Sequence, residues 1–125
     1  MIITRTPFRI SFAGGGTDLR AYYSREPGKV ISSSINNYIY VVLKRQIGIV
    51  EHKYRVNWSK VEFCNEIEEI EHPIVREALK MFDIDFPIEI TTFTEIPGQT
   101  GLGSSSAFAV GLVNGLHALK GEMVT

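Results

Sequence analysis

The sequence has little of several features that would place it in a special class. It contains one cysteine, Cys64, so an internal disulfide is excluded and a reducing compartment is expected. Its formal net charge is −1, so no bulk electrostatic field favours nucleic acid or an anionic membrane as a partner. The longest purely apolar run, 38–43, is far too short to span a bilayer. The partners are therefore expected to be small molecules, and no oligomeric state is indicated.

The first residues also lack a targeting signal. The stretch MIITRTPFRISF has neither the apolar core nor the small-residue cleavage site of a signal peptide. Hydrophobic residues make up 44% and charged residues 22% of the 125 residues, which is typical of one globular domain. The sequence therefore predicts a single domain in the cytoplasm.

The expected elements follow the order strands, helix, strand, loop and helix along the chain. Segments rich in β-branched and aromatic residues predict strands over 9–13, 28–35, 37–46, 53–58, 61–64 and 86–93. Asn36 and Asn37 predict a turn between the second and third of these strands. With the helices described next, this order predicts an α+β fold rather than a strict βαβ repeat.

Three segments have helical features. Thr17 can cap a short helix over 18–24. Pro73 suits the first turn of a helix that extends to Phe82, and His72 before it could be the cap. A third helix, over 107–120, is apolar most of the way round and is expected to be buried. Its two glycines, spaced four residues apart, would let another element pack close.

The segment PGQTGLGSSSA, residues 97–107, is rich in glycine and serine and leads into the third helix. Glycines let a ligand approach the main chain, and the helix N-terminus offers unpaired N–H groups and a partial positive charge. This combination favours an anion site, most often for phosphate. No lysine occurs from 97 to 119, and the spacing differs from the P-loop, dinucleotide and protein-kinase glycine motifs. A phosphate loop and a serine-capped turn both remain open from chemistry alone.

A second dense segment, RTPFRISFAGGGTDL, spans 5–19. Arg9 could pair with phosphate or support a phosphoryl transfer, and Asp18 could accept hydrogen bonds from sugar hydroxyls. The simpler interpretation is a surface arginine and a helix-capping aspartate. Three consecutive glycines beside them leave room for a ligand and favour a binding site.

The two segments together resemble the GHMP kinase superfamily, which is named for galactokinase, homoserine kinase, mevalonate kinase and phosphomevalonate kinase. PGQTGLGSSSA fits the second family motif, P-x-x-x-G-L-x-S-S-x-A, at every fixed position. TPFRISFAGGGTDL fits the first motif, but Gly15 and Gly16 stand where galactokinases carry Glu-His. RISFAGGGTDL, YRVNWSK and EIEHPIVREALK are instead similar to the D-glycero-D-manno-heptose 7-phosphate kinase subgroup.

The resemblance implies a fold and a domain assignment. The fold is the N-terminal domain of GHMP kinases, related to the second domain of a ribosomal protein, with a mixed sheet and helices on one side. Family members are much longer, and their third glycine-rich motif, catalytic aspartate and C-terminal domain have no counterpart here. The expectation is that residues 1–125 are an incomplete N-terminal, nucleotide-binding domain with no substantial activity alone.

The resemblance also implies site residues. Asp18 would bind sugar hydroxyls in a pocket shaped by Gly15, Gly16 and Thr17, and Arg9 would lie near the transferred phosphoryl group. Ser105 would ligate Mg²⁺. The implied ATP-binding residues are Pro97, Gly98, Gln99, Thr100, Gly101, Leu102, Gly103, Ser104, Ser105 and Ser106.

The implied reaction transfers the γ-phosphoryl of ATP to the anomeric hydroxyl of a heptose 7-phosphate. Two alternatives stay open: a fucose- or galactose-type kinase of the same superfamily, and a non-catalytic ATP-binding fragment. Trp58 is interpreted as a core or edge-strand aromatic, with stacking on adenine as the alternative. Cys64, which has no basic neighbour to activate it, is interpreted as a buried structural thiol.

Overall fold

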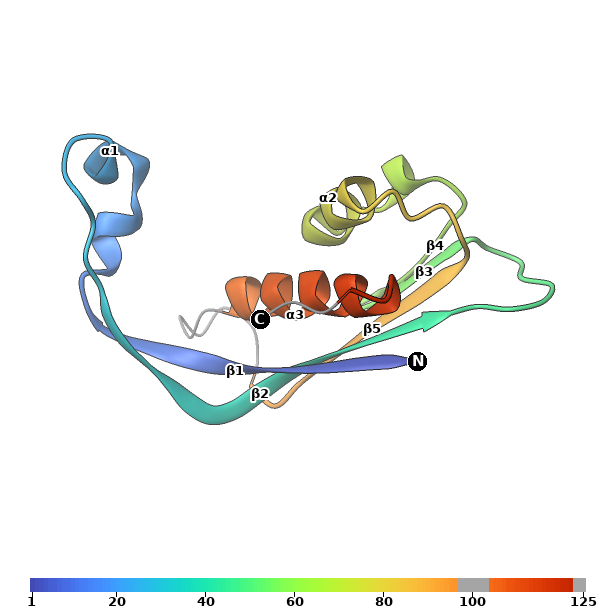
Figure 1. Ribbon diagram of the computed structural model, residues 1–125, viewed down its shortest axis with the longest axis horizontal. Coiled ribbons are helices and arrows are strands. Elements are labelled where there is room, and N and C mark those ends of the chain that lie inside the picture. The colour runs from blue at the N-terminus through green and yellow to red at the C-terminus, as the bar shows by residue number, and fades with distance from the viewer. Residues whose placement is uncertain (97–103, 123–125) are drawn as a thin grey trace.

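The computed structural model describes residues 1–96 and 104–122, and its centre is one five-stranded sheet (Figure 1). The strand order is β1-β2-β5-β3-β4, and all pairs are antiparallel except the parallel pair β3 and β5. The strands are β1 (Ile2–Ala13), β2 (Ile31–Arg45), β3 (Tyr54–Asn57), β4 (Val61–Cys64) and β5 (Ile88–Thr94). The predicted mixed sheet is therefore confirmed.

Two helices cover one face of this sheet, α2 (Pro73–Met81) and α3 (Ser104–Leu119) (Figure 1). Both are in the predicted places, with Pro73 in the first turn of α2 and His72 as its cap. The inward side chains of β2, β5 and β3 meet the helices in one core that includes Val41, Ile90, Leu79 and Leu112. Within the described ranges, no helix has the length and apolar character needed to cross a bilayer.

Helix α3 packs closely against the sheet because two of its residues have no side chain. A Cβ atom added to Gly111 would lie 2.9 Å from the Thr6 hydroxyl oxygen. A Cβ added to Gly115 would lie 2.5 Å from a terminal methyl of Leu43, which is fully buried. The expected close approach at the glycine pair is confirmed, and its partners are β1 and β2.

The turn predicted at Asn36-Asn37 is wrong, because β2 runs through it as one strand. Pro7 pairs with Tyr38, and Arg9 pairs with Ser34, so one residue of β1 faces three of β2 between these pairs. The two asparagines thus lie in a β-bulge, which bends a strand without ending it. The two asparagines do mark irregular backbone, but the irregularity is a bend in β2 and not a turn between two strands (Figure 1).

Beyond the bend, β1 and β2 continue away from the sheet as a two-stranded ribbon (Figure 1). We call residues 9–34 the arm and residues 14–30 its tip. The tip holds a 3-10 turn, η1 (Gly15–Asp18), and one helical turn, α1 (Arg20–Tyr23). The predicted helix over 18–24 is therefore split into two short pieces.

Thr17 does not cap α1 as predicted, since the cap position is Leu19 and has no side-chain hydrogen bond. The Thr17 hydroxyl instead donates to the Gly14 carbonyl at 2.7 Å and accepts from the Lys29 N–H at 3.1 Å. These bonds close the two ends of the tip on each other. The Thr17 hydroxyl therefore closes the loop, whereas the sequence pattern predicted that it would cap a helix.

Candidate functional site

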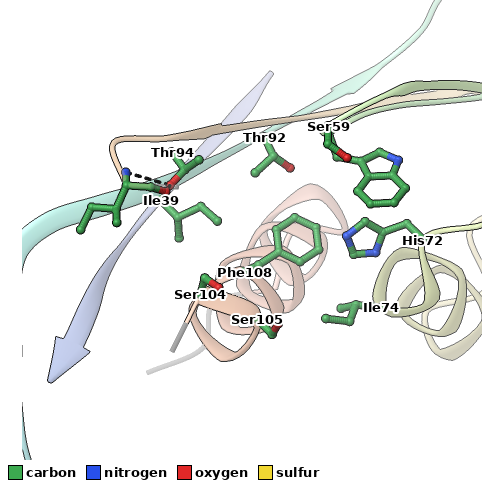
Figure 2. Close-up of a pocket in the computed structure, with 11 residues that line it drawn as sticks. Ile39, Ser59, His72, Ile74, Thr92, Thr94, Ser104, Ser105 and Phe108 are labelled. Carbon is green, nitrogen blue, oxygen red and sulfur yellow. Dashed lines mark hydrogen bonds between the residues drawn. The ribbon is translucent and has the colours of Figure 1, made fainter. Parts of the chain in front are cut away.

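A cavity of about 500 Å³ lies between the sheet and the starts of α2 and α3. Its volume is in the range of small-molecule sites. Figure 2 shows side chains from β2, β5, the β3–β4 connection and the starts of α2 and α3 converging on it. Its lining residues are Ile39, Trp58, Ser59, His72, Ile74, Thr92, Thr94, Ile96, Ser104, Ser105 and Phe108. The lining is mainly apolar, with hydroxyl groups at intervals.

Three aromatic rings form one wall of this cavity. The ring centroids of Trp58 and His72 are 4.7 Å apart in an edge-on arrangement, and those of His72 and Phe108 are 5.0 Å apart. Trp58 keeps 38% of its surface exposed although it lies at the end of β3. The expectation of a core or edge-strand aromatic is wrong, because Trp58 directly follows β3, which lies between β5 and β4 in the sheet, and its side chain is exposed. Its position in the cavity wall leaves it available for stacking on a ligand.

A buried carboxylate, Glu62, holds this wall together. It points inward from the edge strand β4 and is only 7% exposed. One of its oxygens accepts from the Trp58 indole N–H at 2.9 Å and from the His72 backbone N–H at 3.3 Å. The other accepts from the Glu71 N–H at 2.6 Å. The N-terminus of α2 adds a favourable dipole, so the carboxylate has the partners that a buried charge requires.

The His72 side chain is fixed by the helix that it caps. The Val75 N–H donates to His72 Nδ1 at 3.4 Å. Burial lowers the pKa of His72 below its ordinary value of 6.5, and the nearby Glu62 carboxylate opposes this only in part. The neutral imidazole therefore dominates at pH 7, and its proton is on Nε2 because Nδ1 is an acceptor.

The structure places some of the predicted ATP-binding residues at this cavity. Ser104 and Ser105, in the first turn of α3, line it directly. Ser106 instead faces a second cavity of about 170 Å³, which it shares with Arg9. The start of α3 is thus next to Arg9, as a common phosphate region requires. The remaining predicted ATP-binding residues, 97–103, lie outside the described residues.

The predicted sugar-binding residues lie apart from these cavities. Gly15, Gly16 and Asp18 are exposed at the arm tip, and a Cβ on either glycine would meet nothing within 4 Å. Neither cavity described above is lined by any residue of 15–18. The structure therefore brings Arg9 to the start of α3 but does not bring the arm tip to the same place.

The described residues supply little of a Mg²⁺ site. Ser105 is exposed and offers one hydroxyl, and the lining of the cavity beside it contains no carboxylate. Within residues 1–96 and 104–122, no cluster of three or more histidine, cysteine or acidic side chains could hold a metal. Because Mg²⁺ is usually held by carboxylates together with substrate phosphates, these residues alone do not fit a resident ion.

Sequence reasoning missed Glu62 and Phe108 and left His72 as a cap only. An acid within the four-residue strand VEFC was a usable signal, because alternation puts Glu62 on the same side as the core residue Cys64. Cys64 itself is buried, and burial raises the pKa of its thiol. Its interpretation as a structural thiol is confirmed.

Comparisons with known proteins agree with this geometry. Residues 73–125 match the family described as GHMP kinases N terminal domain. The chain is 31% identical over 124 residues to a D-glycero-alpha-D-manno-heptose 7-phosphate kinase of Campylobacter jejuni, covering 90% of this chain and 36% of that enzyme. The chain therefore spans little more than a third of the length of this relative.

Solved structures show the same fold at low sequence identity. A D-glycero-D-manno-heptose 1-phosphate kinase from Bacteroides thetaiotaomicron is 19% identical with a TM-score of 0.77, over 97% of this chain and 42% of that one. Streptococcus pneumoniae phosphomevalonate kinase, in complex with phosphomevalonate and AMPPNP, is 19% identical with a TM-score of 0.70, over 100% of this chain and 39% of that one. On the family match, the relative and the shared fold, the chain belongs to the GHMP kinases and has the fold of their N-terminal domain.

Proposed function

We propose that the chain is the nucleotide-binding part of a sugar kinase. The reaction transfers the γ-phosphoryl group of ATP to the anomeric hydroxyl of a heptose 7-phosphate. A bond forms between the sugar oxygen and the γ-phosphorus, the bond from that phosphorus to the β,γ-bridging oxygen breaks, and ADP leaves. The hydroxyl loses its proton, so the products are ADP and a heptose 1,7-bisphosphate.

One observation carries the nucleotide assignment: an aromatic cavity opens directly at the N-terminus of a long helix. A nucleoside triphosphate has a flat, weakly polar base at one end and a polyphosphate at the other. Trp58, His72 and Phe108 suit the base, and the first turn of α3 suits the phosphates. A sugar would need more polar partners than this lining provides.

The roles of single residues follow from this orientation. Ser104 and Ser105 lie where the phosphates leave the cavity, in line with the predicted phosphate loop. Arg9 shares a cavity with Ser106 and would support the charge that develops on the transferred phosphoryl group. Ser105 would give Mg²⁺ one ligand, and the phosphates of ATP would have to give others. Asp18 would bind sugar hydroxyls at the arm tip.

The substrate class comes from the sequence motifs and the C. jejuni relative. Gly15 and Gly16 replace the Glu-His of galactokinases, which favours a heptose phosphate over galactose. The relative is a heptose 7-phosphate kinase at 31% identity. This choice of substrate is tested with a full-length enzyme that contains residues 1–125. Its turnover is measured with heptose 7-phosphate, galactose, fucose and mevalonate. Turnover of the heptose phosphate is expected, and turnover of another sugar alone would overturn it.

We further propose that residues 1–125 are the N-terminal domain of a longer kinase and do not catalyse transfer alone. The chain covers 36% of the C. jejuni relative, and the described residues contain no base positioned beside Arg9 and Ser106. The isolated chain is expected to bind ATP and tripolyphosphate in calorimetry. ATP-dependent phosphorylation of a heptose 7-phosphate by this chain would contradict the domain assignment, and absence of ATP binding would contradict the nucleotide assignment.

A further inference from the structure

The aromatic wall contains a polar group that the phosphate loop does not explain. We propose that His72 determines base specificity: its Nε2–H donates a hydrogen bond to a ring nitrogen of a purine stacked in the cavity, and Glu62 is the positioning residue that fixes His72 and Trp58. This inference rests on the proposed function, because it assigns the base end of the same nucleotide site.

The first step is the orientation of the His72 ring. Its backbone N–H is bound by Glu62, and its Nδ1 accepts from the Val75 N–H. In Figure 2 the imidazole projects from the start of α2 toward Phe108 and the interior of the cavity. Two separate anchors therefore hold the ring with its outer edge facing the place where a ligand would lie.

The second step is the proton. Nδ1 is occupied as an acceptor, so a neutral His72 must carry its hydrogen on Nε2. Burial favours that neutral form by lowering the pKa of His72, and the Glu62 carboxylate opposes this only in part. No other described residue makes a hydrogen bond with Nε2. The cavity thus presents a single fixed donor, which fits an unprotonated ring nitrogen.

The third step is the Glu62 clamp. A buried carboxylate is costly unless it is fully hydrogen-bonded, and Glu62 accepts bonds from the Trp58 indole and from the backbone N–H groups of Glu71 and His72. It therefore couples the indole from the end of β3 to the main chain of His72 at the start of α2. Without it, the two rings would have no common anchor, and the spacing of the wall would depend on packing alone.

These steps predict a purine ligand with a stacking face and a ring-nitrogen acceptor on one edge. Pyrimidine nucleotides are smaller and would not fill the distance between the α3 start and the Trp58–His72 pair as well. The comparison that isolates the hydrogen bond uses ATP and its 1-deaza, 3-deaza and 7-deaza analogues, each of which replaces one nitrogen with C–H.

The test measures dissociation constants of these four nucleotides for the wild-type chain and for His72→Phe. In the wild type one analogue should bind roughly fivefold more weakly than ATP, the size of one neutral hydrogen bond. His72→Phe keeps an aromatic ring against Trp58 and should bind that analogue and ATP equally. Equal binding of all four nucleotides by the wild type would overturn the proposal.

Two further variants separate specificity from folding. His72→Asn keeps a capping side chain for α2 but removes the ring donor, so it should show the same loss of discrimination. His52→Phe changes a histidine that packs on Phe63, outside the cavity, and should discriminate as the wild type does. Discrimination retained by His72→Asn would contradict the role of Nε2.

Glu62→Gln tests the positioning role. Its amide N–H would face one of the three N–H groups that now donate to Glu62, so one of these bonds would be lost. It should lose the discrimination between ATP and the sensitive analogue and keep its affinity for tripolyphosphate. Glu89→Gln is the matched control, since Glu89 bonds Asn57 on the opposite face of the same sheet. Loss of tripolyphosphate binding in Glu62→Gln would indicate a merely structural role.

Failure of this inference is distinguishable from failure of the proposed function. If the wild-type chain binds neither ATP nor tripolyphosphate, both proposals are wrong. If tripolyphosphate and ATP compete for the chain but all three deaza analogues bind as tightly as ATP, the nucleotide site is supported and the proposed role of His72 is wrong.

Discussion

The two regions that carry the family motifs are built in different ways. The cavity beside α2 and α3 has walls held by a buried carboxylate, a helix cap and close helix–sheet packing. The arm tip is exposed, and its described side-chain bonds to the main chain come from Thr17. The cavity is therefore a preformed site, whereas the polar groups of the tip are exposed and no other part of the described chain faces them.

The largest expected contrast comes from the same substitution in both regions. Gly115→Val puts a branched side chain against Leu43 and should lower the free energy of unfolding by about 2 kcal/mol. Gly16→Val, at the open tip, should change it by no more than about 0.5 kcal/mol. Denaturant unfolding of the two variants measures both values, and equal losses would contradict the contrast.

A smaller and local effect is expected from Thr17→Val. The variant removes the acceptor of the Lys29 N–H, so hydrogen exchange at that amide should become faster. Exchange in β5 and α3 should be unchanged, because the tip makes no part of the core. Thr17→Ser keeps the hydroxyl and is the control. Unchanged exchange at Lys29 would show that other contacts close the tip.

The smallest expected effect is the pH dependence contributed by His72. Because burial lowers its pKa, the folded protein binds fewer protons than the unfolded chain just below pH 6.5. The contribution of His72 to stability is therefore fully present above pH 6.5, and it is lost as the pH decreases through the folded-state pKa. Protonation also removes the acceptor that caps α2.

His72→Asn should make unfolding less dependent on pH below 6.5 than it is in the wild type. The difference between the two proteins, measured by thermal unfolding from pH 7.5 to 5, isolates this one group from the other acids. An identical pH dependence would show that His72 is not buried in its neutral form.

The sequence predicted regular elements well and specific contacts poorly. Proline at the start of α2 and the apolar pattern of α3 are local signals, and both helices lie where they were expected. The bulge at Asn36 and Asn37 depends on pairing with β1, which is non-local, so the local pattern suggested a turn instead. Thr17 was assigned to a helix for the same reason.

The site shows the same limit. Ser104 and Ser105 were identified from their motif, and the structure places them at the cavity. The alternation in VEFC was a signal for an inward-facing Glu62, but no sequence pattern identified the N–H groups that it binds. These donors come from the end of β3 and the start of α2, so they meet Glu62 only in the folded chain.

The most direct test of the nucleotide site uses the single tryptophan of the chain. Its indole N–H gives one resolved signal in a nitrogen–proton correlation spectrum, and this group is bound to Glu62 in the cavity wall. Addition of ATP should shift that signal in a saturable way and leave the backbone amides of Gly15, Gly16 and Asp18 in place. A static indole signal, with shifts confined to the arm tip, would contradict the account.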